Sequence, residues 1–333
     1  MELITVLVVL PEVINYCILK HVVHTVEKRG LKLGSIVVNQ VTILFIIMGI
    51  GFVAKKINII NEELGKKLSE LLLMIAMPAM ILSSFQFDYS SDIIKNVLLV
   101  MAFAIAAHII SFFIGILLYR KYPENIKKVL MFITMFTNCG FMGFPLLESL
   151  FGKTGVFYGS IYVAIYNLFI WTAGVMIFNG EKGIKSIRKA LLNPGTIAVF
   201  VGMFLFFFSL RLPYPAAKAL DMLGAMTAPL SMLIVGSILA GIDFKSLFSG
   251  FPLYYGIAVR NILLPLLTVA LLKVIGFNGV VLGVCVSVIA MPAGANTPVF
   301  AELYGGDSLF ASKVVALSTL FSIVSIPLIL MLV

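Results

Sequence analysis

The sequence predicts an all-α polytopic membrane protein with ten transmembrane helices, arranged as two inverted repeats of five. Composition is the first of three observations behind this prediction, since 61% of the 333 residues are hydrophobic and only 12% are charged. Mean hydropathy is +1.12, whereas soluble domains carry about 25% charged residues. The second observation is a series of ten apolar runs, and the third is an internal repeat.

Ten runs are long enough to cross a bilayer, for which a helix needs about 20 predominantly apolar residues. They lie at residues 36–54, 68–87, 96–118, 129–149, 155–178, 194–210, 217–240, 251–275, 278–301 and 311–333. The connections between them are short and carry prolines, glycines or charges. No extramembrane domain is therefore predicted, and the protein is expected to act inside or across the lipid bilayer.

Residues 1–34 are predicted to form an N-terminal extension rather than an eleventh span. Pro11, Glu12 and Asn15 interrupt their apolar stretch, and positive charge follows the stretch instead of preceding it, which argues against a signal peptide. His21 and His24 have helical spacing but no third ligand, so no metal site is predicted. The three cysteines of the chain are too scattered for a disulfide framework.

Lysine and arginine concentrate on the loops of one side of the predicted helix array, among them Lys55, Arg120 and Lys185. The positive-inside rule places these loops in the cytoplasm and both ends of the ten-helix unit outside. The net charge of +9 is therefore loop charge that faces a membrane surface. Nucleic-acid binding is not expected, because no basic face stands apart from the spans.

An internal repeat relates the two halves when the chain is shifted by about 153 residues. The shift superposes Pro145 on Pro298, Gly152 on Gly305, and His108 on Asn261. Five crossings per copy is an odd number, so the two copies must have opposite orientations, as in the inverted repeats of secondary transporters. The predicted domains are the extension, a first repeat at 35–180 and a second repeat at 190–333.

Spans four and nine are predicted to be broken, because each carries proline, glycine and asparagine in its centre. These residues are Asn138, Gly140, Gly143 and Pro145 in span four, and Pro292, Gly294, Asn296 and Pro298 in span nine. Proline removes a backbone donor, and the freed polar groups must line an enclosed cavity rather than face lipid. Half-helix N-termini there would offer positive dipole ends to an anion. The alternative is a pair of proline kinks that serve packing.

Close approach of two broken helices would leave no room for a Cβ atom at Gly140 or Gly294.

Arg260 lies ten residues into the eighth span, where a charge is costly and usually functional. It either attracts an anionic substrate or bonds a carbonyl of a broken helix. His108 in the third span is either proton-linked or a hydrogen-bonded packing residue. Asp221 lies near a helix start, where snorkelling to the interface suffices.

Sequence motifs of enzymes are missing from the chain. It has no Gly-x-Ser-x-Gly elbow, no His-Glu-x-x-His and no phosphate-binding loop. We therefore predict neither an enzyme nor an ATP-driven pump, and no cofactor.

The run Asn138-x-Gly140-x-Met142-Gly143-x-Pro145-Leu146 resembles the first-half signature of the auxin efflux carrier family. The run Pro292-x-Gly294-x-Asn296-x-Pro298 is similar to the second-half counterpart in bacterial members. The resemblance covers about residues 35–333. It implies that spans one, two, six and seven form a scaffold, that the other six form a transport domain, and that the broken helices cross at the substrate site. The long central loop of many plant members is missing, which favours a prokaryotic-type permease.

The resemblance also implies a cargo of small organic anions, which are auxin in plant members and malate or malonate in bacterial ones. We therefore predict a secondary carrier of an anion such as a dicarboxylate, located in a prokaryotic cell membrane. Protons or sodium are the candidate coupling ions, and a homodimer is a candidate assembly. The predicted substrate site is Asn138, Gly140, Gly143, Pro145, Arg260, Pro292, Gly294, Asn296 and Pro298. An ion or small-solute channel is the main alternative, because it could also use broken helices.

Overall fold

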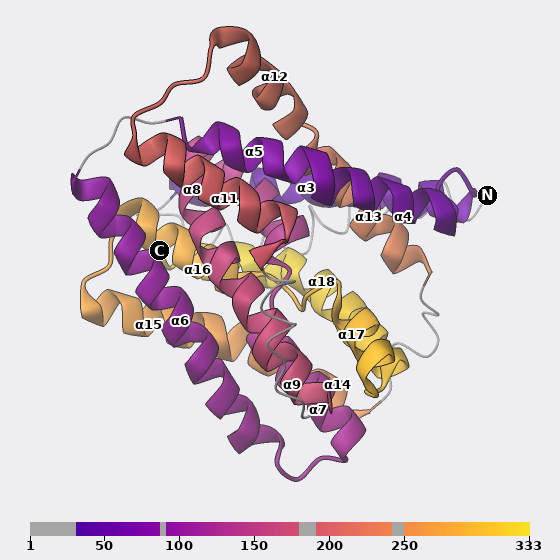
Figure 1. Ribbon diagram of the computed structural model, residues 1–333. Coiled ribbons are helices and arrows are strands. Elements are labelled where there is room, and N and C mark those ends of the chain that lie inside the picture. Colours follow the sequence, from indigo (N-terminus) through magenta and orange to yellow (C-terminus); the bar gives the residue numbers. More distant parts are fainter. Residues whose placement is uncertain (1–30, 87–90, 180–190, 242–249) are drawn as a thin grey trace.

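The computed structural model describes residues 31–86, 91–179, 191–241 and 250–333 (Figure 1). The predicted N-terminal extension falls almost entirely outside the described residues, as does the loop that carries Lys185. Within the described ranges, the regular structure is helical. The helices and π-helical turns are α3 (Leu31–Lys56), α4 (Glu62–Leu71), η2 (Leu72–Ala76), α5 (Met77–Ser84), α6 (Ser91–Tyr119), α7 (Glu124–Met135), η3 (Cys139–Gly143), α8 (Phe144–Phe169), η4 (Ile170–Gly174), α9 (Val175–Asn179), α11 (Pro194–Phe207), α12 (Tyr214–Gly224), α13 (Thr227–Ala240), α14 (Phe251–Ala258), η5 (Val259–Leu263), α15 (Leu264–Ile275), α16 (Gly279–Ala290), α17 (Thr297–Tyr304) and α18 (Ser308–Leu330).

Seven helices of the described ranges are long and apolar enough to cross a membrane. They are Val37–Lys56, Glu62–Ser84, Asp92–Tyr119, Cys139–Phe178, Tyr214–Ala240, Phe251–Ile275 and Ser308–Leu330. Six of them coincide with one predicted span each, whereas Cys139–Phe178 contains span 155–178 together with the second half of span 129–149. Predicted spans 194–210 and 278–301 correspond to shorter helices, and the first part of span 129–149 lies in α7. Large apolar side chains such as Phe113 and Phe200 remain exposed on the outer faces of the helices, as contact with lipid requires.

The ends of several helices follow from single residues. Asn61, Asn193 and Asp307 cap α4, α11 and α18, because each side chain accepts a hydrogen bond from a first-turn amide. Gly276 and Gly305 end α15 and α17 in the left-handed conformation, with φ of 91° and 78°, which glycine adopts at little cost. Polar and glycine residues thus fix the boundaries between apolar helices.

Three prolines follow π-helical turns inside helices that continue past them. Three π-helical turns each end two residues before a proline. The pairs are η2 with Pro78, η3 with Pro145, and η5 with Pro265. A proline has no N–H to donate and its ring crowds the preceding turn, and a π turn accommodates this by adding one residue to the turn.

Two breaks interrupt the helices, at Phe136–Asn138 between α7 and η3, and between α16 and α17 after Ala290. Both lie inside the segments that the sequence predicted to be broken. The first lies before Gly140, Gly143 and Pro145, because these three residues are themselves helical. The loop expected between 149 and 155 is a kink at Gly152, where φ is 59° and the helix continues on both sides.

Two groups of packed helices lie on opposite sides of the molecule (Figure 1). On one side α11 and α12 both pack on α5, and on the other α9, α14 and α17 all pack on α7. Helices α3 and α13 pack closely against each other. A Cβ atom on Gly236 of α13 would overlap the Met48 carbonyl and lie 2.8 Å from the Phe52 nitrogen of α3. The pair is therefore held at a separation that only glycine permits.

Gly236→Ala is expected to lower the melting temperature of the purified protein in detergent. The new methyl group meets backbone atoms of α3, which cannot rotate away, and overpacking of this kind costs about 1–3 kcal/mol. Gly49→Ala on α3 is the matched control, because no atom lies within 4 Å of a Cβ built there. Equal melting temperatures for the two variants would contradict the close packing of α3 on α13.

Candidate functional site

The two broken segments pair with each other in the middle of the molecule. The Asn138 amide donates to the Pro292 carbonyl at 2.8 Å, and the Gly294 amide donates to the Phe136 carbonyl at 3.1 Å. An antiparallel bridge lies between these two hydrogen bonds. Backbone groups that leave a helix inside a membrane need partners within the protein, and each broken helix supplies the partners for the other.

This pairing brings most of the predicted site residues together. Asn138, Pro292 and Gly294 take part in it directly, and Asn296 stands at the N-terminal cap of α17. The remaining residues of the two motifs, Gly140, Gly143, Pro145 and Pro298, follow in η3 or in the first turns of α8 and α17. The two asparagines thus stand where one helix begins on each side of the crossing.

Space at the crossing is not the same for the two glycines. A Cβ atom on Gly294 would lie 2.8 Å from Asn296 Oδ1, and 3.3 and 3.4 Å from the carbonyl oxygens of Thr137 and Phe136. A Cβ atom on Gly140 would meet only the Met77 methyl group, at 3.6 Å. The expectation of no room for a Cβ is therefore correct at Gly294 and wrong at Gly140, which faces the end of a flexible side chain.

Arg260 is fully buried and donates to three backbone carbonyls. Its Nη1 lies 3.1 Å from the Thr134 oxygen and its Nε 3.3 Å from the Met291 oxygen, while Nη2 donates to Ile289. These carbonyls belong to the C-terminal ends of α7 and α16, where helices leave carbonyls unpaired and carry partial negative charge. Of the two roles that the sequence allowed for Arg260, these contacts match the second, in which it donates hydrogen bonds to carbonyls of the broken helices.

Three polar atoms at the crossing are buried without a hydrogen-bond partner among the described residues. They are Thr137 Oγ1, Asn138 Nδ2 and Asn296 Oδ1. Buried polar groups are almost always hydrogen-bonded, so each of these needs a partner such as a ligand or water. They lie beside the N-terminal ends of η3 and α17, which offer free N–H groups and positive potential. Asn138 Nδ2 and the Thr137 hydroxyl have hydrogens to donate, whereas Asn296 Oδ1 can only accept.

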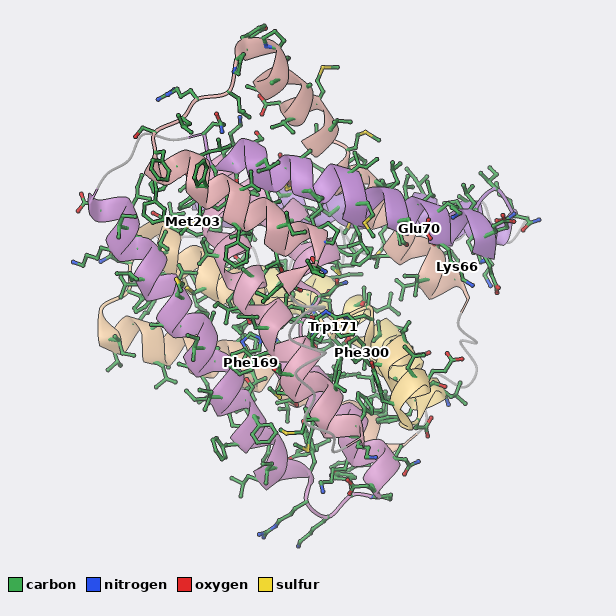
Figure 2. The ribbon with its side chains drawn as sticks, viewed as in Figure 1. Lys66, Glu70, Phe169, Trp171, Met203 and Phe300 are labelled. Atoms are coloured by element: carbon green, nitrogen blue, oxygen red, sulfur yellow. The ribbon has the colours of Figure 1, made fainter. Side chains whose placement is uncertain are left out.

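An aromatic cluster packs α17 against the first half of the chain. The centroid of the Phe300 ring lies 5.0 Å from that of Phe132 in α7 and 5.5 Å from that of Trp171 in η4. Figure 2 shows Trp171 and Phe300 side by side. Such ring pairs add about 0.5–1.5 kcal/mol beyond the burial of their area. The N-terminal end of α17 is thus fixed at the crossing by contacts from both sides of the break.

The ion pair between Lys153 and Asp221 joins segments that are distant in sequence. Lys153 donates to Asp221 Oδ1 at 2.7 Å, and the Ser83 hydroxyl donates to the same oxygen. The sequence suggested only that Asp221 reaches the membrane interface. In the structure its side chain also connects α12 with α8 and α5. By contrast, the exposed side chain of Glu70 in the last turn of α4 (Figure 2) pairs with Lys67 of the same helix at 2.9 Å.

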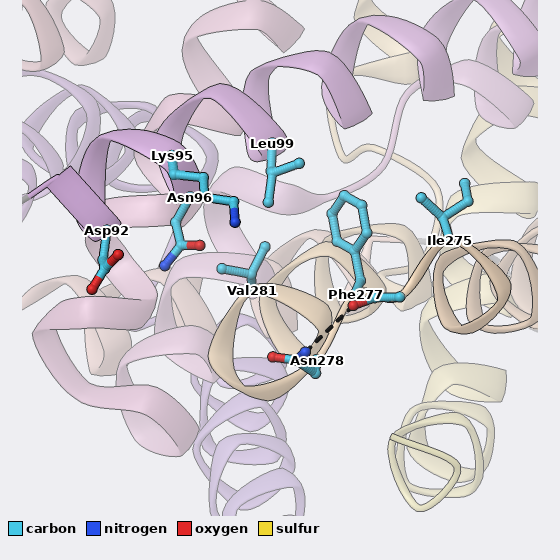
Figure 3. A pocket seen from close by; sticks show the side chains of 9 residues that line it. Asp92, Lys95, Asn96, Leu99, Ile275, Phe277, Asn278 and Val281 are labelled. Atoms are coloured by element: carbon cyan, nitrogen blue, oxygen red, sulfur yellow. Dashed lines mark hydrogen bonds between the residues drawn. The ribbon is translucent and has the colours of Figure 1, made fainter.

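A cavity of about 450 Å³ opens between the start of α6 and the α15–α16 connection (Figure 3). Its polar lining consists of Asp92, Lys95, Asn96 and Asn278. None of the predicted site residues lines it, so it is separate from the crossing. Within the described ranges, no group of three or more histidine, cysteine, aspartate or glutamate residues could hold a metal ion.

Comparison with known proteins gives a consistent result. The sequence model of a family described as membrane transport protein matches residues 36–184 and 180–330. An uncharacterized transporter of Methanocaldococcus jannaschii is 27% identical over 304 residues, which covers 86% of this chain and 96% of the relative. An uncharacterized transporter of Methanothermobacter thermautotrophicus is 24% identical over 291 residues, covering 86% of this chain and 94% of the relative.

Proposed function

This chain belongs to the membrane transport protein family and is a multi-pass membrane transporter, not an enzyme, and from that premise we propose that it is a secondary carrier for a small organic anion. The substrate site is the crossing of the two broken segments. The observation that carries this proposal is the pair of unpartnered buried donors, Asn138 Nδ2 and the Thr137 hydroxyl. A carboxylate would accept hydrogen bonds from Asn138 and Thr137 and from free amides of the helix ends.

The charge arrangement at the crossing supports an anion rather than a cation. Arg260 offsets the partial negative charge of the α7 and α16 C-termini, while the partial positive charge at the starts of η3 and α17 has no such counter-charge in these contacts. The net field at the centre therefore favours a negative ligand. Malate, malonate and auxin, the cargo implied by the sequence resemblance, all carry carboxylates.

We further propose that the chain crosses the membrane ten times as two inverted repeats, at residues 35–180 and 190–333. In support, α7 and α16 both approach the crossing with their C-terminal ends, and η3 and α17 both leave it with their N-terminal ends. The two broken segments also pair in antiparallel fashion. Two structural repeats in opposite membrane orientations would have this geometry. They would allow the substrate site to open to either side of the membrane in turn.

The transport cycle would move one group of helices against another. The scaffold would contain α3–α5 and α11–α13, which include the closely packed pair α3 and α13. The transport domain would contain α6–α9 and α14–α18, which hold the crossing. The Lys153–Asp221 ion pair then joins the two bodies, because Lys153 lies in α8 and Asp221 in α12.

Counterflow in proteoliposomes tests this function. Purified protein is reconstituted, the lumen is loaded with unlabelled malate, malonate or indole-3-acetate, and entry of the same labelled anion is followed. A carrier takes up label faster when the far side is loaded, whereas a channel does not. No saturable, loading-dependent uptake of any of the three anions would reject the proposed function.

Asn138→Ala and Asn296→Ala are expected to raise the apparent substrate constant in this assay by about two- to tenfold each. Each variant removes a neutral hydrogen-bond partner worth about 0.5–1.5 kcal/mol. Asn125→Ala is the control, because Asn125 is exposed at the far end of α7. An unchanged constant in both crossing variants would place the anion elsewhere.

Asp221→Asn is expected to raise the maximal counterflow rate by up to about fivefold. Movement of the transport domain against the scaffold requires the Lys153–Asp221 pair to break, and the variant removes that pair. An exposed ion pair is worth at most about 1 kcal/mol. The charge-swapped double variant Lys153→Asp, Asp221→Lys should return the rate toward wild type. Glu70→Gln removes an ion pair within one helix and should change nothing. A rate unaffected by Asp221→Asn would mean that this pair stays intact during transport.

A further inference from the structure

His108 is a buried histidine with one ring nitrogen unused. Only 1% of the residue is exposed, and Nδ1 lies 2.7 Å from the Ala104 carbonyl. Because a carbonyl can only accept, Nδ1 must carry the ring proton and Nε2 must be the bare acceptor. Nε2 is buried and has no hydrogen-bond partner among the described residues. The ring therefore has one free position, and that position can take a proton.

Aromatic rings enclose His108 next to the crossing. Phe169, labelled in Figure 2, stacks on it at 4.8 Å with an angle of 14° between the planes. Tyr162 and Tyr166 lie at 5.5 and 5.9 Å, and Phe136 at 5.8 Å. Phe136 is the residue whose carbonyl bonds Gly294 across the two breaks. The imidazole is thus one side chain away from the proposed anion site.

The groups that face the ring can stabilise a proton there only with help from a ligand. The titratable residues around it are Tyr162 and Tyr166 from α8, and the charge that acts on it is that of Arg260 from η5. From α7 it meets the Phe136 ring. A second positive charge at this depth is costly unless a negative charge accompanies it. A carboxylate bound at the crossing would supply that charge.

We propose that His108 is the proton carrier of this transporter, taking up one proton at Nε2 when the anion binds at the crossing. The inference rests on the proposed function. The Nε2 lone pair accepts a proton from a hydronium ion on the side where the site is open, which forms the imidazolium and releases a water molecule. When the site opens on the other side and the anion leaves, the same N–H bond breaks and the proton passes to water on that side. One proton then accompanies each anion, and no electrons are exchanged.

The equivalent position of the second half supports this role. His108 superposes on Asn261 in the internal repeat. Asn261 is also fully buried, donates to the Ser318 carbonyl at 3.0 Å, and has an unpartnered Oδ1 atom. Both halves therefore place a bare acceptor at this point, but only the histidine can be protonated. Because binding energies are reciprocal, an anion that favours the proton is itself favoured by the proton.

The test is the pH dependence of anion binding, measured with whichever of malate, malonate and indole-3-acetate shows counterflow. In wild-type protein the apparent constant should fall by up to about tenfold per unit decrease in pH, as one linked proton requires. His108→Gln should lose this dependence. Ionisation of the anion itself is the same for both proteins and cancels in their ratio. Tyr162→Phe, which removes the hydroxyl of a neighbouring titratable residue, should keep the wild-type slope.

A second measurement does not depend on the variant. Wild-type protein in weakly buffered detergent solution with a pH-indicator dye should take up about one proton when the anion is added. Equal slopes for wild type and His108→Gln, or no proton uptake by the wild type, would overturn the proposal while leaving counterflow, and hence the proposed function, intact. Absence of counterflow with all three anions would reject both.

Discussion

Gly294→Val is expected to abolish counterflow while the protein still inserts and purifies. The Cβ atom would lie 3.3 and 3.4 Å from two carbonyl oxygens of the opposite broken segment, and the valine methyl groups would extend farther. To make room, the segments must separate and lose the Gly294–Phe136 hydrogen bond. Forced overpacking costs about 1–3 kcal/mol even for small additions, and a displacement at the crossing removes the geometry that the anion requires.

Gly140→Ala is the control for this prediction. Its Cβ atom would make an ordinary contact with the Met77 methyl group at 3.6 Å, so most of the counterflow should remain. Counterflow and size-exclusion profiles are measured for both variants, because the profile separates loss of transport from loss of fold. Normal counterflow by a well-folded Gly294→Val protein would show that the two broken segments need not approach closely.

Arg260→Gln is expected to destabilise the whole protein. Three carbonyls inside the membrane lose a charged donor, and a glutamine amide, with two N–H groups on a shorter chain, cannot reach all of them. A hydrogen bond to a charged group contributes about 1.5–3 kcal/mol. A large fall in melting temperature should therefore accompany the loss of counterflow. Arg260→Lys keeps the charge but not the planar fork, so it should recover only part of the stability.

The melting temperature and the substrate constant together decide between the two roles of Arg260. If its main partners are the helix ends, stability falls in Arg260→Gln for every anion and also without one. If its main partner is the substrate, the constant for anions rises at least about tenfold while the melting temperature stays that of wild type. The second result would assign Arg260 to direct anion binding.

The sequence predicted the helical class and the location of both breaks because these depend on local chemistry. Apolar runs define the spans, and proline, glycine and asparagine mark the segments around Asn138 and Asn296. The exact start of the first break was less predictable. A proline acts on the turn before it and can be absorbed by a π turn, as at Pro145, so it marks a perturbed segment without fixing the residue at which the helix stops.

Contacts between distant segments could not be predicted. The partners of Arg260 lie 126 residues before it and about 30 residues after it, and those of Asp221 lie on two other helices. Nor does the sequence distinguish Gly140 from Gly294, because both occur in the same kind of motif. The difference between them is the nearest atom across the crossing, which is a flexible methyl group for one and a rigid backbone for the other.

The contacts of Arg260 also have a consequence for how the protein is made. Helices enter the bilayer in the order of synthesis, so the segment with Arg260 reaches the lipid after α7 and before α16. An arginine at the centre of a helix adds about 2.5–3.5 kcal/mol to the cost of insertion. At that moment only the Thr134 carbonyl of its three partners has been synthesised. In a nascent chain that ends near residue 275, the insertion of the Arg260 segment therefore depends on α7 being in the bilayer already. The second half, produced alone, would lack the Thr134 carbonyl and leave Arg260 with only the Ile289 and Met291 carbonyls as partners.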